Sequence, residues 1–273
     1  MPRNTGVPVD GGWRVSGRFP FSSGCDNAQW AILGVRAEDA AGNKPTRYML
    51  VPMAEIEILD DWQVLGLRGT GSKTLVLKDF FVSVHRTVLL RDLLEGTTPG
   101  ALVYPDYPLL RAPRGFLVPF SLPSVTFALG RKALGIVPAA LRSRLSRGTR
   151  DLAESEFVQM QLAEAGAEID LACLIVRSRR DESMALLASG AGASVEAGMR
   201  NRRDIAFAAE LVRRGVDRLA DLSGSRIVHD DDPMQAILRD VRTIATHAVV
   251  LRQINYPPYG RAMLGLPAVF GEA

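Results

Sequence analysis

Few side chains in this sequence can act as acids, bases or nucleophiles near neutral pH. The histidines are His85, His229 and His247, and the cysteines, Cys25 and Cys173, lie far apart. Because their spacing matches no ligand pattern of a zinc site, we expect no metal centre. His247 is the candidate acid or base, since an imidazole with an ordinary pKa of about 6.5 exchanges protons near neutral pH.

His247 ends a stretch with helical periodicity. Over 233–250 apolar residues recur at steps of three and four, while Asp240, Thr243 and His247 form a polar stripe. The proline at the first position and the aspartates of 230–232 favour a helix start, so we predict one amphipathic helix over this stretch. Asp240 would lie about 10 Å from His247, too far to orient its ring, whereas Thr243 is one turn away. Taken alone, a single histidine on a helix is more often structural or solvated than catalytic, so both interpretations stay open.

Two short segments combine glycines with hydroxyl groups. They are Phe21-Ser-Ser-Gly24 and Gly66-Leu-Arg-Gly-Thr-Gly-Ser72. The second is not a Walker phosphate loop, because its lysine follows a serine and a strand rather than a helix is expected next. Taken alone, each segment is a turn between strands.

Composition bounds the class of protein. With 273 residues, 47% hydrophobic and 23% charged, the chain is globular and long enough for one large or two ordinary domains. A net charge of +3 with scattered arginines makes nucleic acid a poor partner. The start shows no apolar signal core, and no run approaches the ~20 apolar residues of a membrane span, so we expect a cytoplasmic protein without a membrane segment.

The residue composition and pattern of the chain change near residue 89. Residues 1–88 carry short β-branched and aromatic runs separated by turn residues, which predicts an antiparallel β-barrel or sandwich. Residues 89–115 are rich in proline, glycine and tyrosine and are expected to form a linker or a substrate-facing loop. The predicted strands are Trp13–Val15, Gln29–Val35, Arg47–Pro52, Ile56–Leu59, Trp62–Leu65, Thr74–Leu77 and Phe81–Val84.

Residues 116–273 are dominated by helical periodicity. Helices are expected at 122–147, at 152–180, within 182–222 and at 233–250, with Gly190–Ser194 as a possible interruption. Four long helices predict a bundle. The expected fold class is therefore α+β in two segments, a β-barrel or sandwich domain followed by a four-helix bundle.

Taken together, these segments resemble the acyl-CoA dehydrogenase superfamily, from its middle β-domain to its C-terminal helical bundle. Gly12–Gly17 followed by Phe21–Gly24 is similar to the flavin-contacting strand and loop of that superfamily. Trp62–Ser72 resembles the second signature of the β-domain, and Pro233–Asp240 resembles the last bundle helix.

The residues after Arg239-Asp240 distinguish two branches of the superfamily. In dehydrogenases of the medium-chain type a glutamate base stands nine residues after the arginine, and Ala248 occupies that place here. His247 stands where the reduced-flavin monooxygenases have a histidine. The loop 66–72 and the closing segment 260–267 also look like that branch, the two-component, group D monooxygenases.

This resemblance implies a function. Reduced FMN or FAD, supplied by a separate flavin reductase, would react with oxygen to give a C4a-hydroperoxyflavin that hydroxylates an aromatic or polyketide-like small molecule. His247 and Ser23 would be catalytic, with the Ser23 hydroxyl near flavin N5. Assembly as a homo-oligomer, a dimer or tetramer, is expected through the bundle. The implied cofactor-binding residues are Phe21, Ser22, Ser23, Gly24, Arg239 and Asp240.

The resemblance also leaves alternatives open. In this superfamily a helical domain precedes the β-domain, whereas Met1 stands only shortly before Gly12. We therefore expect a fragment, a chain whose missing domain is a separate polypeptide, or a truncated paralogue. The last would bind no flavin and act as a partner subunit or as a cofactor-independent catalyst. Acyl-CoA dehydrogenation is the weakest alternative, because Ala248 cannot be the base.

Overall fold

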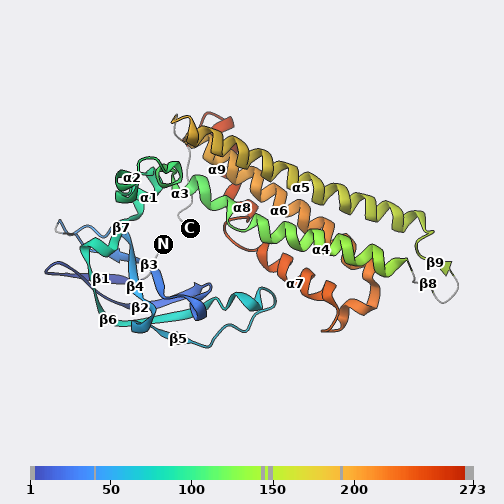
Figure 1. Ribbon diagram of the computed structural model, residues 1–273, viewed down its shortest axis with the longest axis horizontal. Helices are drawn as coiled ribbons and strands as arrows, with labels where there is room; N and C mark the ends of the chain where they lie inside the picture. The colour runs from blue at the N-terminus through green and yellow to red at the C-terminus, as the bar shows by residue number, and fades with distance from the viewer. Residues whose placement is uncertain (1–3, 40, 143–144, 147–149, 191–192, 268–273) are drawn as a thin grey trace. The chain divides into compact units, whose positions relative to one another are not determined.

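The structure is a computed structural model that describes residues 4–39, 41–142, 145–146, 150–190 and 193–267 (Figure 1). It divides into two compact units, the first ending at Arg114 and the second beginning at Gly115. Residues 143–144 and 147 of the predicted 122–147 helix and residues 191–192 of the predicted interruption 190–194 lie outside the described residues. The prediction that this helix continues to residue 147 was wrong, because the helix ends at Leu141 and Leu145–Ser146 form a short strand.

The first unit is built on a seven-stranded sheet with the strand order β5-β6-β2-β1-β3-β4-β7. Its pairs are antiparallel except for β1 and β3, which run parallel. The predicted β-domain is present, but the sheet is mixed, and its edge strands β5 and β7 do not pair among the described residues, so it is not a closed barrel. The strands are β1 (Thr5–Val9), β2 (Gly12–Ser22), β3 (Trp30–Ala37), β4 (Thr46–Pro52), β5 (Glu57–Leu59), β6 (Lys73–Ser83) and β7 (Thr87–Leu89).

Three strand predictions differ from the structure. Strand β1 was not predicted, because its Gly6 and Pro8 are poor strand formers. The expected strands 74–77 and 81–84 are parts of one long strand, β6. The expected strand 62–65 is irregular, since the indole Nε1 of Trp62 donates to the carbonyl of Leu67 at 3.1 Å within the same loop.

The core of the first unit follows the alternation of side chains along its strands. Residues at every second position of β2, β3, β4 and β6 face one side of the sheet and are buried there. Leu33 and Met49, directly opposite each other on β3 and β4, are both in this set. Buried members of the cluster include Trp13, Val15, Phe19, Leu33, Val35, Met49, Val51, Leu75 and Leu77.

The segment 89–115 contains short helices in place of the expected loop. They are α1 (Leu90–Glu95), α2 (Pro99–Val103), the 3₁₀ helix η5 (Pro108–Arg111) and α3 (Arg114–Leu117). Gly96 ends α1 at φ 74°, and a Cβ there would lie 2.2 Å from the carbonyl oxygen of Arg111. Glycine is therefore required where the segment folds back on itself.

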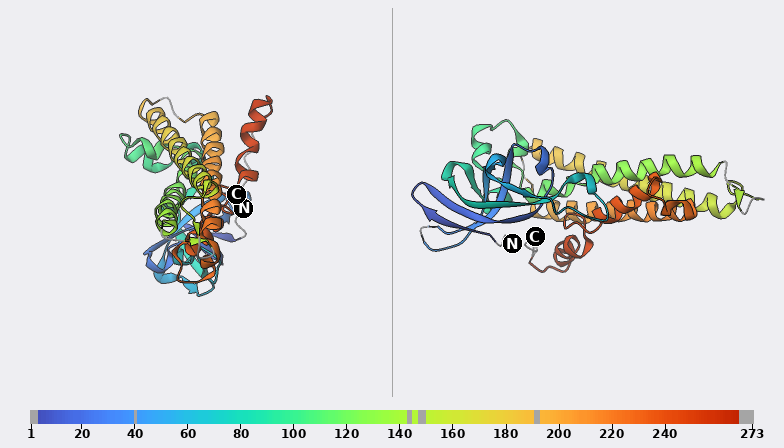
Figure 2. Two further views of the ribbon diagram at one scale, coloured as in Figure 1. Left: turned by 90° about the vertical axis from the view of Figure 1, so that its right-hand side faces the viewer. Right: turned by 90° about the horizontal axis from the view of Figure 1, so that it is seen from below.

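The second unit is a helical bundle. Helices α4 (Pro123–Leu141), α5 (Glu156–Ala188), α6 (Val195–Ser223) and α7 (Pro233–Ile244) correspond to the four predicted helices (Figures 1 and 2). Their buried faces form one apolar core. A Cβ on Gly215 of α6 would lie 3.0 Å from Ile169 Cγ1, so the glycine allows α5 and α6 to approach closely. Shorter elements complete the unit: η6 (Val118–Phe120), β8 (Leu145–Ser146), β9 (Arg150–Asp151), η7 (Gly224–Val228), α8 (Arg252–Asn255) and α9 (Pro257–Met263).

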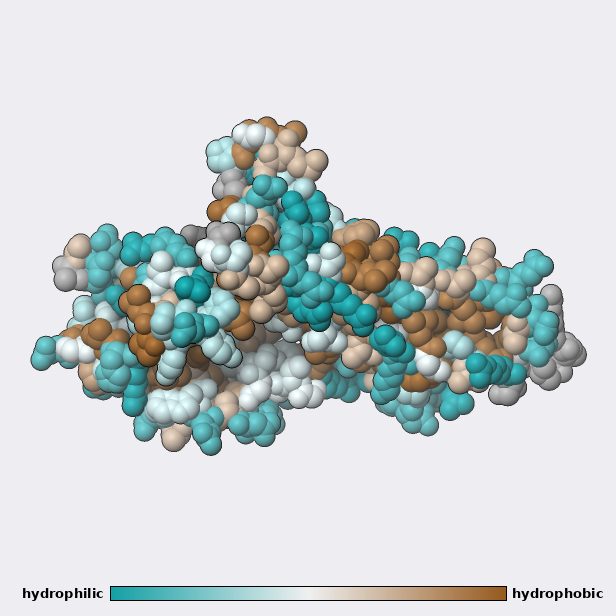
Figure 3. All heavy atoms as spheres, turned by 45° about the horizontal axis from the view of Figure 1, so that its top comes forward, coloured by the Kyte–Doolittle hydropathy of each residue, from teal (hydrophilic) through white to brown (hydrophobic). Residues whose placement is uncertain are grey.

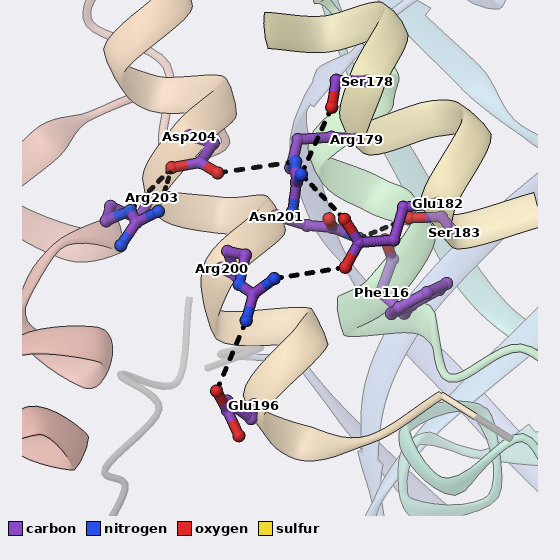
Figure 4. A network of polar contacts seen from close by, with 10 residues as sticks. All are labelled: Phe116, Ser178, Arg179, Glu182, Ser183, Glu196, Arg200, Asn201, Arg203 and Asp204. Atoms are coloured by element: carbon purple, nitrogen blue, oxygen red, sulfur yellow. Dashed lines mark hydrogen bonds and ion pairs between the residues drawn. The ribbon is translucent and has the colours of Figure 1, made fainter. Parts of the chain in front are cut away.

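A polar network joins α5 to α6 (Figure 4). The buried amide of Asn201 donates to Ser183 Oγ at 2.9 Å and to the carbonyl of Phe116 at 3.4 Å. Ion pairs flank this buried contact, with Glu182 2.7 Å from Arg179 and 3.2 Å from Arg200. Because a buried amide is costly without partners, these bonds favour one register of α5 against α6.

One described segment, Arg114–Leu141, is long and apolar enough to cross a membrane by length and composition. No such segment was predicted, and Arg131 and Lys132 interrupt its apolar residues. Ala133, Val137 and Leu141 of this segment pack into the bundle core, which accounts for part of its apolar character.

Candidate functional site

The two glycine- and hydroxyl-rich loops lie side by side at one end of β2 and β6. The backbone N–H of Gly24 donates to the carbonyl of Thr70 at 2.9 Å, and the thiol of Cys25 donates to the carbonyl of Gly71 at 3.3 Å. The sequence predicted both loops, and the sheet joins them because β2 pairs with β6, with Ser22 opposite Lys73.

The backbone of both loops is strained. Phe21 and Leu67 have φ values of 59° and 57°, in the left-handed region that side chains with a Cβ rarely adopt. Among the described residues other than glycine, Asp79 alone shares this feature. Such strain is kept where the surrounding structure enforces it, and it concentrates at ligand sites.

Three hydroxyl groups connect the loops in a chain. Ser23 Oγ lies 2.7 Å from Ser72 Oγ, and Ser72 Oγ lies 2.7 Å from Thr70 Oγ1. Thr70 Oγ1 donates to the carbonyl of Leu67 at 2.9 Å. Ser23 is exposed, whereas Ser72 is only 6% exposed, so the chain runs from the surface into the loop. Thr70 and Ser72 were not assigned a role from sequence, because only folding makes them neighbours of Ser23.

Aromatic side chains flank these hydroxyl groups. Phe21 is 76% exposed and lies edge-on to Trp62 with ring centroids 6.0 Å apart. Trp62 lines a hollow of about 560 Å³ together with Gln63, Val64, Leu65 and Arg68. The exposed phenyl ring thus lies against a residue that lines this open hollow.

The side chains of Ser22 and Lys73 make contacts within and between the two loops. The hydroxyl of Ser22 donates to the carbonyl of Phe19 at 2.9 Å. The ammonium of Lys73 lies 3.1 Å from Asp60 and 3.1 Å from Asp26, and hydrogen bonds to these carboxylates raise its pKa. Lys73 therefore stays charged and holds the two loops together.

Helix α7 carries the second group of candidate residues. It begins as predicted, with Pro233 at its first position and Asp232 accepting a hydrogen bond from the N–H of Met234 at 2.8 Å. The prediction that it continues to Val250 was wrong, because α7 ends at Ile244 and a turn follows. His247 lies in that turn rather than on a helical stripe.

Thr243 does not orient His247. Its hydroxyl donates to the carbonyl of Arg239 at 2.8 Å, and its own carbonyl accepts from the hydroxyl of Thr246 at 2.8 Å.

Arg239 is half-buried, and its Nε is buried without a hydrogen-bond acceptor among the described residues. Asp240 is half-buried beside it on α7.

The imidazole of His247 has a defined donor and acceptor. Its Nδ1 accepts a hydrogen bond from the N–H of Val249 at 3.2 Å, so the neutral ring carries its proton on Nε2. The residue is exposed overall, yet partial desolvation lowers its pKa below the ordinary value of 6.5. At neutral pH His247 is therefore uncharged and offers Nε2–H as a donor.

Asn255 of α8 holds this turn and was not singled out in the sequence. Its buried amide donates to the carbonyls of Ala248 and Leu251, both at 2.8 Å. Its oxygen accepts from Nε of Arg202 on α6 at 3.0 Å. The sequence around Asn255 gives no signal that it holds the turn, because its partners are backbone carbonyls and an arginine that is distant in the sequence.

The closing segment 260–267 begins in α9 beside a second hollow of about 440 Å³. The guanidinium of Arg203 lies over the ring of Tyr259, 3.9 Å from its centroid. Burial raises the pKa of Tyr256, which also lines this hollow. The remaining lining residues are Asp204, Phe207 and Gly260.

The structure thus arranges the predicted residues in two groups. Phe21, Ser22, Ser23 and Gly24 lie together in the first unit, where Thr70 and Ser72 join them. Arg239, Asp240 and His247 follow one another along α7 and its turn in the second unit. No described residues form a group of histidine, cysteine, aspartate and glutamate that could hold a metal ion.

Comparison with known proteins defines the class. Residues 125–252 match the family model described as acyl-CoA dehydrogenase, C-terminal domain. The crystal structure of 3-HSA hydroxylase from Rhodococcus sp. RHA1 has a TM-score of 0.90 and 29% identity, covering 98% of this chain and 70% of that one. XiaF from Streptomyces sp., in complex with FADH2 and glycerol, has a TM-score of 0.84 and 28% identity, covering 98% and 68%.

Two sequence relatives narrow this class. The oxygenase component of the FADH(2)-dependent resorcinol hydroxylase of Rhizobium sp. (strain MTP-10005) is 34% identical over 94% of this chain and 66% of its own length. The oxygenase subunit HsaA of a flavin-dependent monooxygenase from Mycobacterium tuberculosis (strain ATCC 25618 / H37Rv) is 34% identical over 97% of this chain and 68% of its own length. The chain thus spans about two thirds of the length of these relatives. It belongs to the oxygenase components of the two-component flavin-dependent monooxygenases, which share the acyl-CoA dehydrogenase fold.

Proposed function

We propose that this chain works in a flavin-dependent hydroxylation of an aromatic small molecule, with reduced flavin supplied by a separate reductase. The observation that carries the proposal is the contact between the loops of Phe21–Gly24 and Leu67–Ser72, which places an exposed phenyl ring, an exposed hydroxyl and a hollow together. The named relatives support it, because they are oxygenase components of such enzymes.

The residues present fit a flavin. A planar isoalloxazine ring needs apolar surface for its faces and hydrogen-bonding groups at its edge, which Phe21, Trp62 and Ser23 offer. Bound reduced flavin supplies the electrons that activate oxygen for hydroxylation. We propose that Ser23 lies at flavin N5, and that Arg239 and Asp240 contribute to the cofactor site.

We further propose reduced FAD as the favoured form. A relative with 34% identity is named FADH(2)-dependent, and the structural relative XiaF was solved with FADH2. His247 would act through Nε2, which carries the proton of the neutral ring and donates it, because Nδ1 is occupied by the N–H of Val249. The aromatic class of substrate follows the resorcinol hydroxylase.

We propose a homo-oligomer formed through the bundle. Apolar side chains reach the surface of the helical unit, as the brown spheres in Figure 3 show. On α5, Phe157, Met160, Leu171 and Leu174 are exposed at helical spacing along its outer side. A stripe of this kind is typical of a helix that packs on another chain. Light scattering of the purified chain tests this proposal, and a monomer at all concentrations would contradict it.

The proposed activity is tested by binding and turnover. The purified chain is titrated with FAD and with dithionite-reduced FAD without oxygen, and then mixed with resorcinol, oxygen, NADH and a flavin reductase. We expect the reduced flavin to bind and a hydroxylated product to form. If neither flavin binds, the flavin-free alternative, a partner subunit or a cofactor-independent catalyst, replaces this proposal.

A further inference from the structure

The peptide unit between Ala248 and Val249 makes a hydrogen bond on each of its two sides. Its carbonyl, which belongs to Ala248, accepts from the side-chain amide of Asn255 at 2.8 Å. Its N–H, which belongs to Val249, donates to Nδ1 of His247 at 3.2 Å. Because a peptide unit is planar, a rotation that moves its carbonyl also moves its N–H. Asn255 and His247 are therefore connected through one rigid plane.

The amide of Asn255 has a fixed orientation. Its Nδ2 also donates to the carbonyl of Leu251 at 2.8 Å, and its Oδ1 accepts from Nε of Arg202 at 3.0 Å. A carbonyl can only accept and a guanidinium can only donate, so these partners determine which way the amide points. The residue is 1% exposed, so water cannot readily replace them. The charged donor at Oδ1 polarises the amide and strengthens its bond to Ala248.

The backbone on both sides of this peptide unit is held by the turn. The N–H groups of Val250 and Leu251 donate to the carbonyl of His247 at 3.0 Å and 2.9 Å, and the N–H of His247 donates to the carbonyl of Ile244 at 2.9 Å. These bonds close the turn around the carbonyl of His247. The contacts of Asn255 and of the imidazole act on the Ala248–Val249 plane itself.

We infer that Asn255 is a positioning residue for His247, which keeps Nδ1 an acceptor and the proton of the neutral ring on Nε2 through the Ala248–Val249 peptide unit. The consequence for catalysis rests on the proposed function, in which His247 acts through Nε2. A ring that loses the contact at Nδ1 can turn about its side-chain bonds and can carry its proton on either nitrogen. Asn255 thus sets which nitrogen of His247 is the donor.

The first test observes the protonated nitrogen directly. The chain is labelled with ¹⁵N-histidine, and long-range ¹H–¹⁵N spectra are recorded at about pH 8, where the ring is neutral because its pKa lies below 6.5. The signals of His247 are those that His247→Gln lacks. In the unmodified chain we expect Nδ1 to have the shift of an acceptor nitrogen and Nε2 that of a protonated one.

Asn255→Asp breaks the connection at the carbonyl of Ala248. The carboxylate has the same shape as the amide and can still pair with Arg202, but it has no proton to donate to the carbonyl. The Ala248–Val249 plane is then released, and some of the rings carry their proton on Nδ1. We expect the Nδ1 and Nε2 signals of His247 to move toward each other.

Two controls separate positioning from stability. Arg202→Met removes the donor to Oδ1 but leaves the amide protons of Asn255 for Ala248, so Nδ1 of His247 should remain an acceptor. His229, another exposed histidine of the second unit, is the internal control in each spectrum and should not shift. Asn255→Ala takes the place of Asn255→Asp if the latter does not fold, which circular dichroism shows.

The second test asks whether Asn255 acts on the reaction through His247. Resorcinol hydroxylation is measured with reduced FAD, oxygen and a flavin reductase. We expect Asn255→Asp to lower kcat by about 10- to 100-fold with little change in KM, because a misplaced acid or base slows the chemical step more than binding. In the His247→Ala background the same change should cause no further loss.

Each outcome supports or overturns the inference. Shifted ring signals in Asn255→Asp, with a loss of kcat that disappears in the His247→Ala background, support it. Unshifted signals in a folded Asn255 variant, or an equal loss of kcat in both backgrounds, overturn it while the proposed function stands. If the unmodified chain forms no hydroxylated product, the proposed function fails. The ring signals alone then support the positioning of His247 if they shift and overturn it if they do not.

Discussion

The side-chain amide of Asn255 donates to the carbonyl of Ala248 at a distance of 2.8 Å, across the turn that carries His247. With its bonds to Leu251 and Arg202, this 1% exposed residue ties the turn to α6. The position of the candidate acid or base therefore depends on a residue that lies outside α7.

Asn255→Ala is expected to destabilise the fold and displace the turn. The change removes the hydrogen bonds of a buried amide to the carbonyls of Ala248 and Leu251 and to the Nε of Arg202, which should cost about 2–3 kcal/mol. Urea denaturation measures this loss. The exposed Asn43→Ala is the control and should change the unfolding free energy by less than about 0.5 kcal/mol. Equal effects of the two variants would argue against the role assigned to Asn255.

His247→Ala is expected to lower the hydroxylation rate with little effect on folding. The residue is exposed, so removing its ring leaves no cavity, whereas loss of an acid or base typically costs a factor of about 10²–10⁴ in rate. Steady-state product formation with reduced FAD gives the rate. His229→Ala, another exposed histidine of the second unit, should retain full activity. Full activity in His247→Ala would show that the imidazole only covers the surface and takes no part in the reaction. Ala248→Glu should not replace His247, because it adds a carboxylate at a different position of the turn.

The stability of the chain should fall as the pH drops below about 6.5 through His247. Desolvation lowers the pKa of this imidazole in the folded state, so the unfolded chain binds the proton first. Above the pKa of His247 in the unfolded chain, its contribution to the free energy of unfolding is fully present. Below that pKa the contribution decreases. An NMR titration of the ring should give a pKa under 6.5. In urea unfolding at pH 5.5 and 7.5, His247→Gln should show a smaller difference than the unmodified chain, and an unchanged difference would contradict this assignment.

Asp232→Ala is expected to weaken the start of α7. Its carboxylate accepts from the N–H of Met234 at 2.8 Å and lies 3.1 Å from Arg226, so we expect a loss of about 1–2 kcal/mol. The neighbouring Asp231→Ala removes an exposed carboxylate that does not cap the helix and should stay within about 0.5 kcal/mol. Chemical denaturation of both variants tests this, and a similar loss in both would show that general charge near the helix start matters more than the cap.

Local signals in the sequence were sufficient to predict most of the helices and strands. Short runs of β-branched and aromatic residues predicted β3 and β4, and Pro233 with the aspartates before it predicted the start of α7, because each signal lies within or next to the element that it describes. The helical periodicity of residues 116–273 predicted a bundle for the same reason. The end of α7 was mispredicted, since apolar spacing continues to Val250 while the bonds of Asn255 to the backbone favour a turn.

The sequence alone determined the two candidate loops, the histidine and the resemblance to a flavin-dependent family, because these are properties of residue types and short spacings. The tertiary structure decided which side chains work together. Ser72 and Thr70 stand far from Ser23 along the chain, and only the pairing of β2 with β6 brings their hydroxyl groups within hydrogen-bonding distance. Asn255 likewise reaches Arg202 only because α8 packs on α6. Hydrogen bonds act over about 3 Å, so residues distant in sequence acquire them only when the chain is folded.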